Sequence, residues 1–131
     1  MIAPDTNLLV RVITRDEPRQ AAVALDVLRS GALWIPKTVL LELEWVLRYS
    51  YGFDREAVNR ALARVASLVN AEIEDALQVD RALDWHRRGM DLADALHLAS
   101  CGGHVTFATF DRDLAKSAQV PPDAPQVLLL T

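Results

Sequence analysis

Hydrophobic and polar positions along the chain follow two periods, which predict short strands separated by amphipathic helices. Short apolar runs between turn residues predict strands, and apolar residues spaced three or four apart predict helices. Strands are expected at 1–4, 33–35, 68–73, 105–108 and 126–130. Helices are expected at 8–13, 17–29, 38–49, 55–66, 76–87, from 91 to the glycines at 102–103, and for one turn at 114–118. This alternation predicts an α/β fold, with a mainly parallel sheet of four to five short strands covered by helices on both faces.

The length fits one domain. At 131 residues, of which 51% are hydrophobic, the chain can bury one sizeable core, so we expect a single domain over residues 1–131. No apolar run approaches the roughly 20 residues of a membrane helix. The N-terminus also lacks a basic region followed by an apolar stretch. The sequence therefore predicts a cytoplasmic protein that does not enter a membrane.

Acidic side chains follow two of the predicted strands and open one of the predicted helices. Asp5 follows the first strand, and Asp111 follows the fourth, with Asp113 two residues later. Asp94 lies in the first turn of a helix. Because the carboxyl ends of parallel strands converge on one crevice, we expect these carboxylates to meet in space. Carboxylates without cysteine favour hard cations such as Mg²⁺ or Mn²⁺, which predicts a metal site.

Glu42 is predicted to lie on the buried side of its helix. At about 100° per residue, Lys37, Glu44 and Arg48 fall within roughly 40° of one another, and we take them as the solvent face. Glu42 lies about 140° away. Burying an unpaired carboxylate costs several kcal/mol, so Glu42 should be protonated, ion-paired or bound to metal. The apolar neighbours expected beside it are Val39, Trp45, Val46 and Tyr49.

Each acidic residue also has an ordinary structural interpretation. Asp5 fits an Asx turn or a helix N-cap, and Asp94 gains from the dipole of a helix that Asp91 can cap. One aspartate of the pair at 111 and 113 can cap the helix that follows while the other binds metal. Glu42 can meet a buried arginine or reach solvent at the end of its helix. These alternatives stay open when each segment is considered alone.

Net charge does not exclude a nucleic-acid partner. The chain carries 14 basic and 18 acidic side chains, a net charge of −4, whereas nucleic-acid binders are often basic. If Asp5, Glu42, Asp94 and Asp111 form one cluster, the remaining charges sum to zero, because 18 minus 4 leaves 14. A divalent cation in the cluster would attract phosphate. We therefore expect weak non-specific binding in the absence of metal.

Taken together, four segments resemble the PIN-domain ribonucleases, in particular VapC-like toxins of bacterial toxin-antitoxin systems. The segments are 5–7 (Asp-Thr-Asn), 39–43 around Glu42, 91–99 around Asp94, and 109–114 around Asp111 and Asp113. The resemblance covers nearly the whole chain. Pro4 departs from it, because an aliphatic residue is more usual before the first aspartate.

The resemblance implies a three-layer α/β/α sandwich and an endoribonuclease activity that depends on Mg²⁺ or Mn²⁺. It implies that Glu42 holds water or a second ion, and that a VapB-like antitoxin and a homodimer are partners. Catalytic roles are implied for Asp5, Glu42, Asp94 and Asp111, metal binding for Asp5, Asp94, Asp111 and Asp113, and orienting roles for Thr6, Asn7 and Thr109.

Basic residues near the predicted crevice are candidates for holding RNA phosphates. Arg11 and Arg15 lie one helical turn apart after Asp5, and Arg112 separates the two loop aspartates. The alternative for Arg11 and Arg15 is a solvated helix face that pairs with nearby acids. His97 is expected to be a hydrogen-bonded core residue. The three tryptophans, Trp34, Trp45 and Trp85, are expected in packing or interfaces, too far apart to form a base-stacking platform.

Two other functions fit parts of the pattern. A PIN-like module could bind RNA or a protein partner without cleaving it, although the complete acidic set argues against that interpretation. An aspartyl-phosphate phosphatase of the haloacid dehalogenase type also begins with a strand followed by aspartate. That chemistry expects a second aspartate at the position that Asn7 occupies, so we rank it lower.

Overall fold

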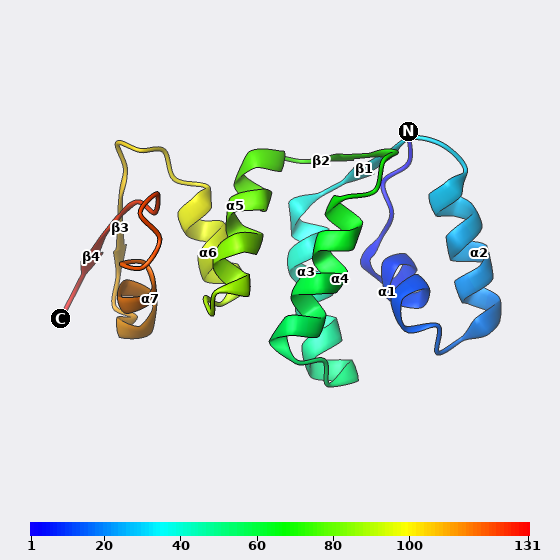
Figure 1. The fold of residues 1–131 in the computed structure, drawn as a ribbon, viewed down its shortest axis with the longest axis horizontal. Coiled ribbons are helices and arrows are strands. Elements are labelled where there is room, and N and C mark those ends of the chain that lie inside the picture. The colour runs from blue at the N-terminus through cyan, green and yellow to red at the C-terminus, as the bar shows by residue number, and fades with distance from the viewer. The chain divides into compact units, whose positions relative to one another are not determined.

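The computed structural model describes residues 1–131 as seven helices and four strands (Figure 1). The chain divides into two compact units, Met1–Ala76 and Leu77–Thr131, which are described separately. The α/β composition is as predicted, whereas the assignment of residues 1–131 to a single domain stays a prediction. None of the helices combines the length and apolar character needed to cross a bilayer.

The first unit contains four helices and one pair of strands. Strand β1 pairs in parallel with β2, with Leu33 opposite Ala71 and Ile35 opposite Ile73. Helix α1 packs against α2 and α3, and α3 packs against α4. Side chains from α1, β1, α3 and α4 form its fully buried core. The elements are α1 (Thr6–Thr14), α2 (Pro18–Arg29), β1 (Leu33–Ile35), α3 (Lys37–Tyr51), α4 (Arg55–Ala66) and β2 (Ala71–Ile73).

The second unit contains three helices and another parallel pair of strands. Thr106 of β3 lies opposite Gln126 of β4, and Thr109 lies opposite Leu129. The short helix α7 packs against both strands. Trp85 on α5 is 1% exposed and is the largest fully buried side chain of the protein. The elements are α5 (Ala76–Arg87), α6 (Leu92–Ala99), β3 (Thr106–Thr109), α7 (Arg112–Ser117) and β4 (Gln126–Leu129).

The sheet is smaller than predicted, because the structure contains two parallel pairs of strands instead of one sheet of four to five. Residues 1–4 form no regular strand and contribute only a parallel bridge from Ile2 to Leu33. Pro4 has no backbone N–H to donate, and Asp5 already caps α1, so little of this segment is left to pair. The expected strand at 68–73 is shortened to β2, since residues 68–70 form a turn closed by the Ala71 N–H and the Leu68 carbonyl.

Capping residues explain why most helix limits agree with the prediction. Asp54 accepts a hydrogen bond from the N–H of Ala57 and begins α4, and Asp91 accepts one from Asp94 and begins α6. Glu17 caps α2, with Pro18 in the first turn. Helix α3 continues two residues beyond its expected end because Gly52, at φ 69°, is the first residue able to adopt the left-handed terminating conformation at little cost.

Candidate functional site

In the first unit, the buried residue Thr6 connects Asp5 to Glu42 through its backbone N–H and its hydroxyl. Asp5 caps α1 through the Thr6 N–H, which donates to Asp5 Oδ1 at 2.8 Å. The Thr6 hydroxyl donates a short hydrogen bond to Glu42 Oε1 on α3, and Thr6 itself is 2% exposed. The carboxylates of Asp5 and Glu42 are exposed. The fold therefore brings two of the predicted acids together on either side of Thr6.

Helix α3 exposes the face predicted to be buried, although Arg48, predicted for the solvent face, is also exposed. Glu42 shares its face with Trp45 and Tyr49, as expected, but all three are exposed. Glu44, assigned to the solvent face by the sequence, is 4% exposed and accepts two hydrogen bonds from Arg48. The prediction failed because Arg48 lies at i+4 on the same helix and supplies the ion pair that allows Glu44 to be buried. Glu42 is thus an exposed carboxylate held by Thr6, rather than a buried one.

In the second unit, Asp94 lies near two other carboxylates. Its backbone N–H donates to Asp91 Oδ2 at 3.2 Å, so Asp91 is the N-cap of α6 and Asp94 is not. The half-buried Asp94 carboxylate accepts no hydrogen bond. Burial raises the pKa of Asp94, and the negative charges of Asp91 and Asp111 raise it further, although His97 opposes them. The side chain therefore lies where a cation would relieve both unfavourable contributions.

Asp111 is the N-cap of α7. Its Oδ1 accepts from the N–H groups of Asp113 and Leu114 at 2.9 and 3.1 Å, and its own N–H donates to the Thr109 hydroxyl at 2.9 Å. The Asp113 carboxylate is exposed in the first turn of the same helix. Of the two loop aspartates, Asp111 is thus the capping residue. Oδ2 of Asp111 and both oxygens of Asp113 remain available to a ligand.

His97 is not the core residue that the sequence predicts. It is exposed on α6 and stacks against Phe107 of β3, with ring centroids 6.3 Å apart and planes inclined by 14°. The prediction relied on the apolar residues of α6, but the buried face of that helix is formed by Leu92, Ala95, Leu96, Leu98 and Ala99.

The structure groups the predicted acids into two sets, one in each unit. Asp5 and Glu42 belong to the first unit, and Asp94, Asp111 and Asp113 to the second. No group of three or more His, Cys, Asp or Glu side chains is arranged to hold a metal ion. The donor chemistry nevertheless fits a hard divalent cation, because every candidate ligand is a carboxylate and Asp94 is half-buried without a hydrogen-bond donor.

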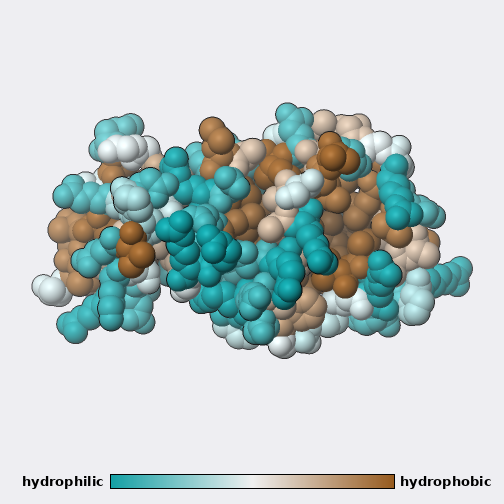
Figure 2. All heavy atoms as spheres, viewed as in Figure 1, coloured by the Kyte–Doolittle hydropathy of each residue, from teal (hydrophilic) through white to brown (hydrophobic).

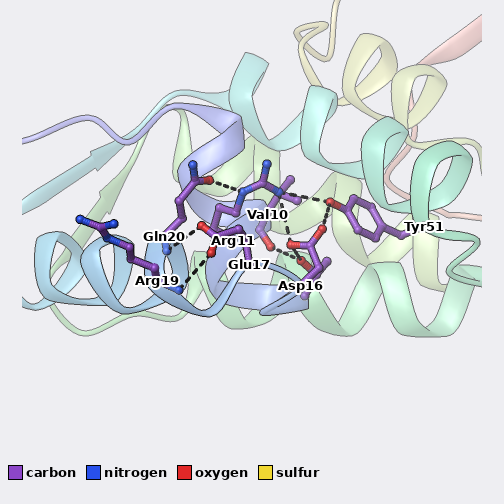
Figure 3. Close-up of polar contacts among 8 residues, drawn as sticks. Val10, Arg11, Asp16, Glu17, Arg19, Gln20 and Tyr51 are labelled. Carbon is purple, nitrogen blue, oxygen red and sulfur yellow. Dashed lines mark hydrogen bonds and ion pairs between the residues drawn. The ribbon is translucent and has the colours of Figure 1, made fainter.

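Among the candidate phosphate ligands, Arg11 already has partners. It bonds Gln20 Oε1 at 2.6 Å, Asp16 Oδ1 at 3.3 Å and the Tyr51 hydroxyl at 3.3 Å, which ties α1 to α2 and to the end of α3 (Figure 3). The Tyr51 hydroxyl in turn donates to Asp16 at 2.7 Å. This bond, followed by one from Thr14 and by the Arg11 charge, holds the pKa of Asp16 below its usual value. Arg11 therefore pairs with a nearby acid, Asp16, which is the alternative that the sequence left open for it.

Arg15 and Arg112 are exposed and make no ion pair. Arg15 ends α1 in the left-handed conformation, at φ 53°, and donates its N–H to the Arg11 carbonyl at 3.0 Å. Arg112 is the first residue of α7 and lies directly after Asp111. Both guanidinium groups are therefore available to an anionic ligand.

Two cavities of the first unit flank α1, in a region where apolar surface is exposed (Figure 2). One, of about 520 Å³, includes Asn7, Arg11 and Arg19 at its polar rim and an apolar floor from α2. The other, of about 420 Å³, has Arg15 and Arg64 beside apolar side chains of α1 and α4. Arg19 and Arg64 were not predicted as site residues. In the sequence, the only signal for these two arginines is their position on polar helix faces, and many solvated arginines occupy such positions.

Comparison with known proteins identifies the family. The model of the PIN domain matches residues 2–120, which is most of the chain. No curated protein and no solved structure matches it. The matched range contains every acidic residue discussed above, from Asp5 to Asp113. The chain belongs to the PIN domain family, whose members are generally nucleases.

Proposed function

We propose that this protein is a metal-dependent endoribonuclease that hydrolyses RNA and acts as the toxin of a toxin-antitoxin pair. The observation that carries the proposal is the state of Asp94. A half-buried carboxylate that accepts no hydrogen bond, and whose pKa is raised by burial and by two neighbouring acids, costs stability unless a ligand compensates for it. PIN domains usually use divalent metal ions, which would compensate in this way.

Asp5, Asp94, Asp111 and Asp113 are the residues that would hold Mg²⁺ or Mn²⁺. Such an ion, when bound, lowers the pKa of water and neutralises charge that develops on a phosphodiester. The protein orients its ligands through Thr109, whose hydroxyl accepts from the Asp111 N–H, and through the Thr6 N–H, which donates to Asp5.

Glu42 has a separate role in the proposal. Its Oε1 is occupied by the Thr6 hydroxyl, which leaves Oε2 exposed and able to accept a proton from water. Asn7, which follows Thr6 in α1, is exposed and can donate to a phosphate or to a neighbouring carboxylate. Arg15 and Arg112 would hold the RNA backbone, because neither is neutralised by an acid of the chain.

The toxin role and its partners follow from the resemblance of the four acidic segments. A VapB-like antitoxin would inhibit the enzyme by covering its acidic residues, and two copies of the chain would form a homodimer. A gene for a short DNA-binding protein beside the gene for this chain would support the toxin role. Co-expression with that protein should restore growth to cells that this chain arrests.

The enzymatic proposal is tested by cleavage of single-stranded RNA by purified protein. We expect cleavage with Mg²⁺ or Mn²⁺ and none in EDTA. Asp5→Asn should reduce the rate by at least about 100-fold without unfolding α1, because asparagine caps helices about as well as aspartate. Asp123→Asn, which removes an exposed partner of Arg81, is the matched control. Equal cleavage in EDTA, or by Asp5→Asn, would contradict the mechanism.

A further inference from the structure

Two large aromatic side chains lie exposed on α3. Trp45 is 55% exposed and Tyr49 is 62% exposed. They are one turn apart, their ring centroids are separated by 5.1 Å, and their planes are inclined by 46°. An exposed aromatic pair of this kind is a common feature of binding surfaces.

The pair is held in place from the buried side of the helix. Glu44, 4% exposed, accepts hydrogen bonds from Arg48 Nε at 2.8 Å and Nη2 at 3.0 Å. This fixes the guanidinium group so that its Cζ lies 4.5 Å from the centroid of the Tyr49 ring. Tyr49 is thus in contact with both Arg48 and Trp45. Because these contacts restrict the rings before a ligand binds, stacking on them costs less conformational entropy.

The aromatic pair continues the face of the helix that carries Glu42. Residues at i, i+3 and i+7 share one side of an α-helix, so Glu42, Trp45 and Tyr49 form a line. Trp45 is about 4.5 Å and Tyr49 about 10.5 Å along the axis from Glu42, at about 1.5 Å per residue. Because Thr6 links Glu42 to Asp5, this line of side chains begins at the two proposed catalytic residues of the first unit.

We propose that Trp45 and Tyr49 stack on unpaired bases of single-stranded RNA beside the cleaved phosphate. The inference rests on the proposed ribonuclease function and assigns its substrate-binding surface. Every base has a π-face, so such a platform tolerates different sequences but requires bases that are not paired in a duplex. The enzyme should therefore select accessible single strands or loops.

A second copy of the chain is the competing occupant of this surface. Two aromatic side chains bury roughly 300–500 Å² together. A stable interface needs about 800 Å² from each partner. The exposed neighbours along this face, Thr38 and Glu42, are polar, and the apolar neighbour Leu41 is half-buried, so the exposed apolar area extends little beyond the two rings. Binding of a flexible strand with stacked bases fits the small aromatic area better than a protein interface.

The test measures binding separately from cleavage. Full-length protein carrying Asp5→Asn is titrated with a fluorescent, unstructured RNA in Mg²⁺ buffer and followed by anisotropy. Adding Trp45→Leu or Tyr49→Leu should weaken binding by about 5- to 150-fold each, and Trp45→Phe should retain most of it. Val69→Ala changes a fully exposed apolar residue elsewhere and should bind normally. Light scattering of the same samples reports the oligomeric state.

Leucine keeps apolar bulk but has no π-face, which separates stacking from interface packing. Unchanged RNA affinity in both leucine variants would overturn the inference, as would the absence of any RNA binding before they are introduced. Loss of a dimer at constant RNA affinity would also overturn it, and would assign the surface to a second copy. If Trp45-dependent binding is found but the wild type cleaves no RNA, the ribonuclease proposal fails, and only the assignment of Trp45 and Tyr49 to RNA binding stands.

Discussion

At the scale of single residues, the acids of this chain differ in what their surroundings do to them. Asp5 and Asp111 accept backbone hydrogen bonds as helix caps, whereas Asp94 accepts none and lies near other negative charges. Capping gives Asp5 and Asp111 a structural role that would exist without any ligand. Asp94 has no such compensation, which makes it the most informative acid in the second unit.

The raised pKa of Asp94 predicts a gain in stability when its charge is removed. Because the folded protein holds this proton more tightly than the unfolded chain, ionisation of Asp94 costs stability above both pKa values. In EDTA at pH 7, Asp94→Asn should therefore unfold at a higher Tm than the wild type, and it should be inactive. The difference in Tm should shrink as the pH falls below the ordinary pKa of aspartate. A lower Tm for Asp94→Asn at pH 7 would contradict this account.

Thr6 allows the role of a single buried hydroxyl to be measured. Thr6→Val keeps the shape of the side chain but removes the hydrogen bond to Glu42. Loss of such an orienting contact should lower the rate of RNA cleavage by about 10- to 100-fold. Thr6→Ser, which keeps the hydroxyl, should remain within a few-fold of the wild type. If Thr6→Val cleaves RNA normally while its Tm changes, the contact serves stability alone.

Residue burial was the least predictable property of the site. The spacing of α3 correctly grouped Glu42 with Trp45 and Tyr49, but a helical period does not say which face meets the core. The usual rule that charged residues face solvent failed at Glu44, whose i+4 partner Arg48 made burial possible. The i+4 spacing of Glu44 and Arg48 is visible in the sequence, but an ion pair exposed to solvent would have the same spacing.

At the scale of elements, helices were more predictable than strands. Aspartate caps and a terminating glycine fix helix ends through local interactions, so α4 and α5 have the predicted limits. Strands depend on partners that are distant in sequence. Residues 1–4 look like a strand in isolation, but beyond the Ile2 bridge they find no regular partner within their unit.

The hydrogen bond from Tyr51, at the end of α3, to Asp16, which follows α1, makes a pH-dependent contribution to stability. The hydrogen bond from Tyr51 is the largest cause of the lowered pKa of Asp16, so its contribution is present at neutral pH and is lost as the pH falls through the folded-state pKa. Tyr51→Phe should lower the Tm at pH 7 by no more than about 4 °C. The difference should become smaller in acid, where the bond from Arg11 to the Tyr51 hydroxyl remains.

Tyr49→Phe provides the matched control for Tyr51→Phe. The Tyr49 hydroxyl makes no hydrogen bond and the residue is exposed, so removal of that hydroxyl should leave the Tm unchanged at every pH. Equal effects of the two substitutions would show that the Tyr51–Asp16 bond does not couple the helices. A difference of the same size in acid would assign the effect of Tyr51 to packing or to its bond with Arg11, and not to Asp16.

At the scale of the whole molecule, the sequence predicted the α/β class and most of the elements, and the family match covers nearly the same residues. The extent of the sheet was not predicted correctly, because pairing of strands depends on long-range contacts that local patterns do not encode. The acidic set was found by motif and resemblance. The cavities beside α1 depend on how helices pack, and no motif marks them.

Divalent cations should stabilise the intact protein if its carboxylates bind them. A ligand that binds only the folded state adds about 2.7 kcal/mol at 100 times its Kd, which should raise the Tm by several degrees. Mg²⁺ or Mn²⁺ should have this effect, reversible by EDTA, in thermal unfolding of the wild type. Asp111→Asn should lose the response while keeping the α7 cap, and Asp123→Asn should keep it. An equal rise in all three proteins would indicate non-specific binding.

Arg15 shows where binding and stability have opposing requirements. Helices that end in the left-handed conformation usually do so at glycine, and a side chain there costs about 1 kcal/mol. Arg15→Gly should therefore raise the Tm while weakening the binding of RNA. A substitution chosen to relax the backbone at this helix end would remove an unpaired positive charge from the edge of the cavity beside α1 and α4. Thermostable variants of this protein should be designed with position 15 held fixed.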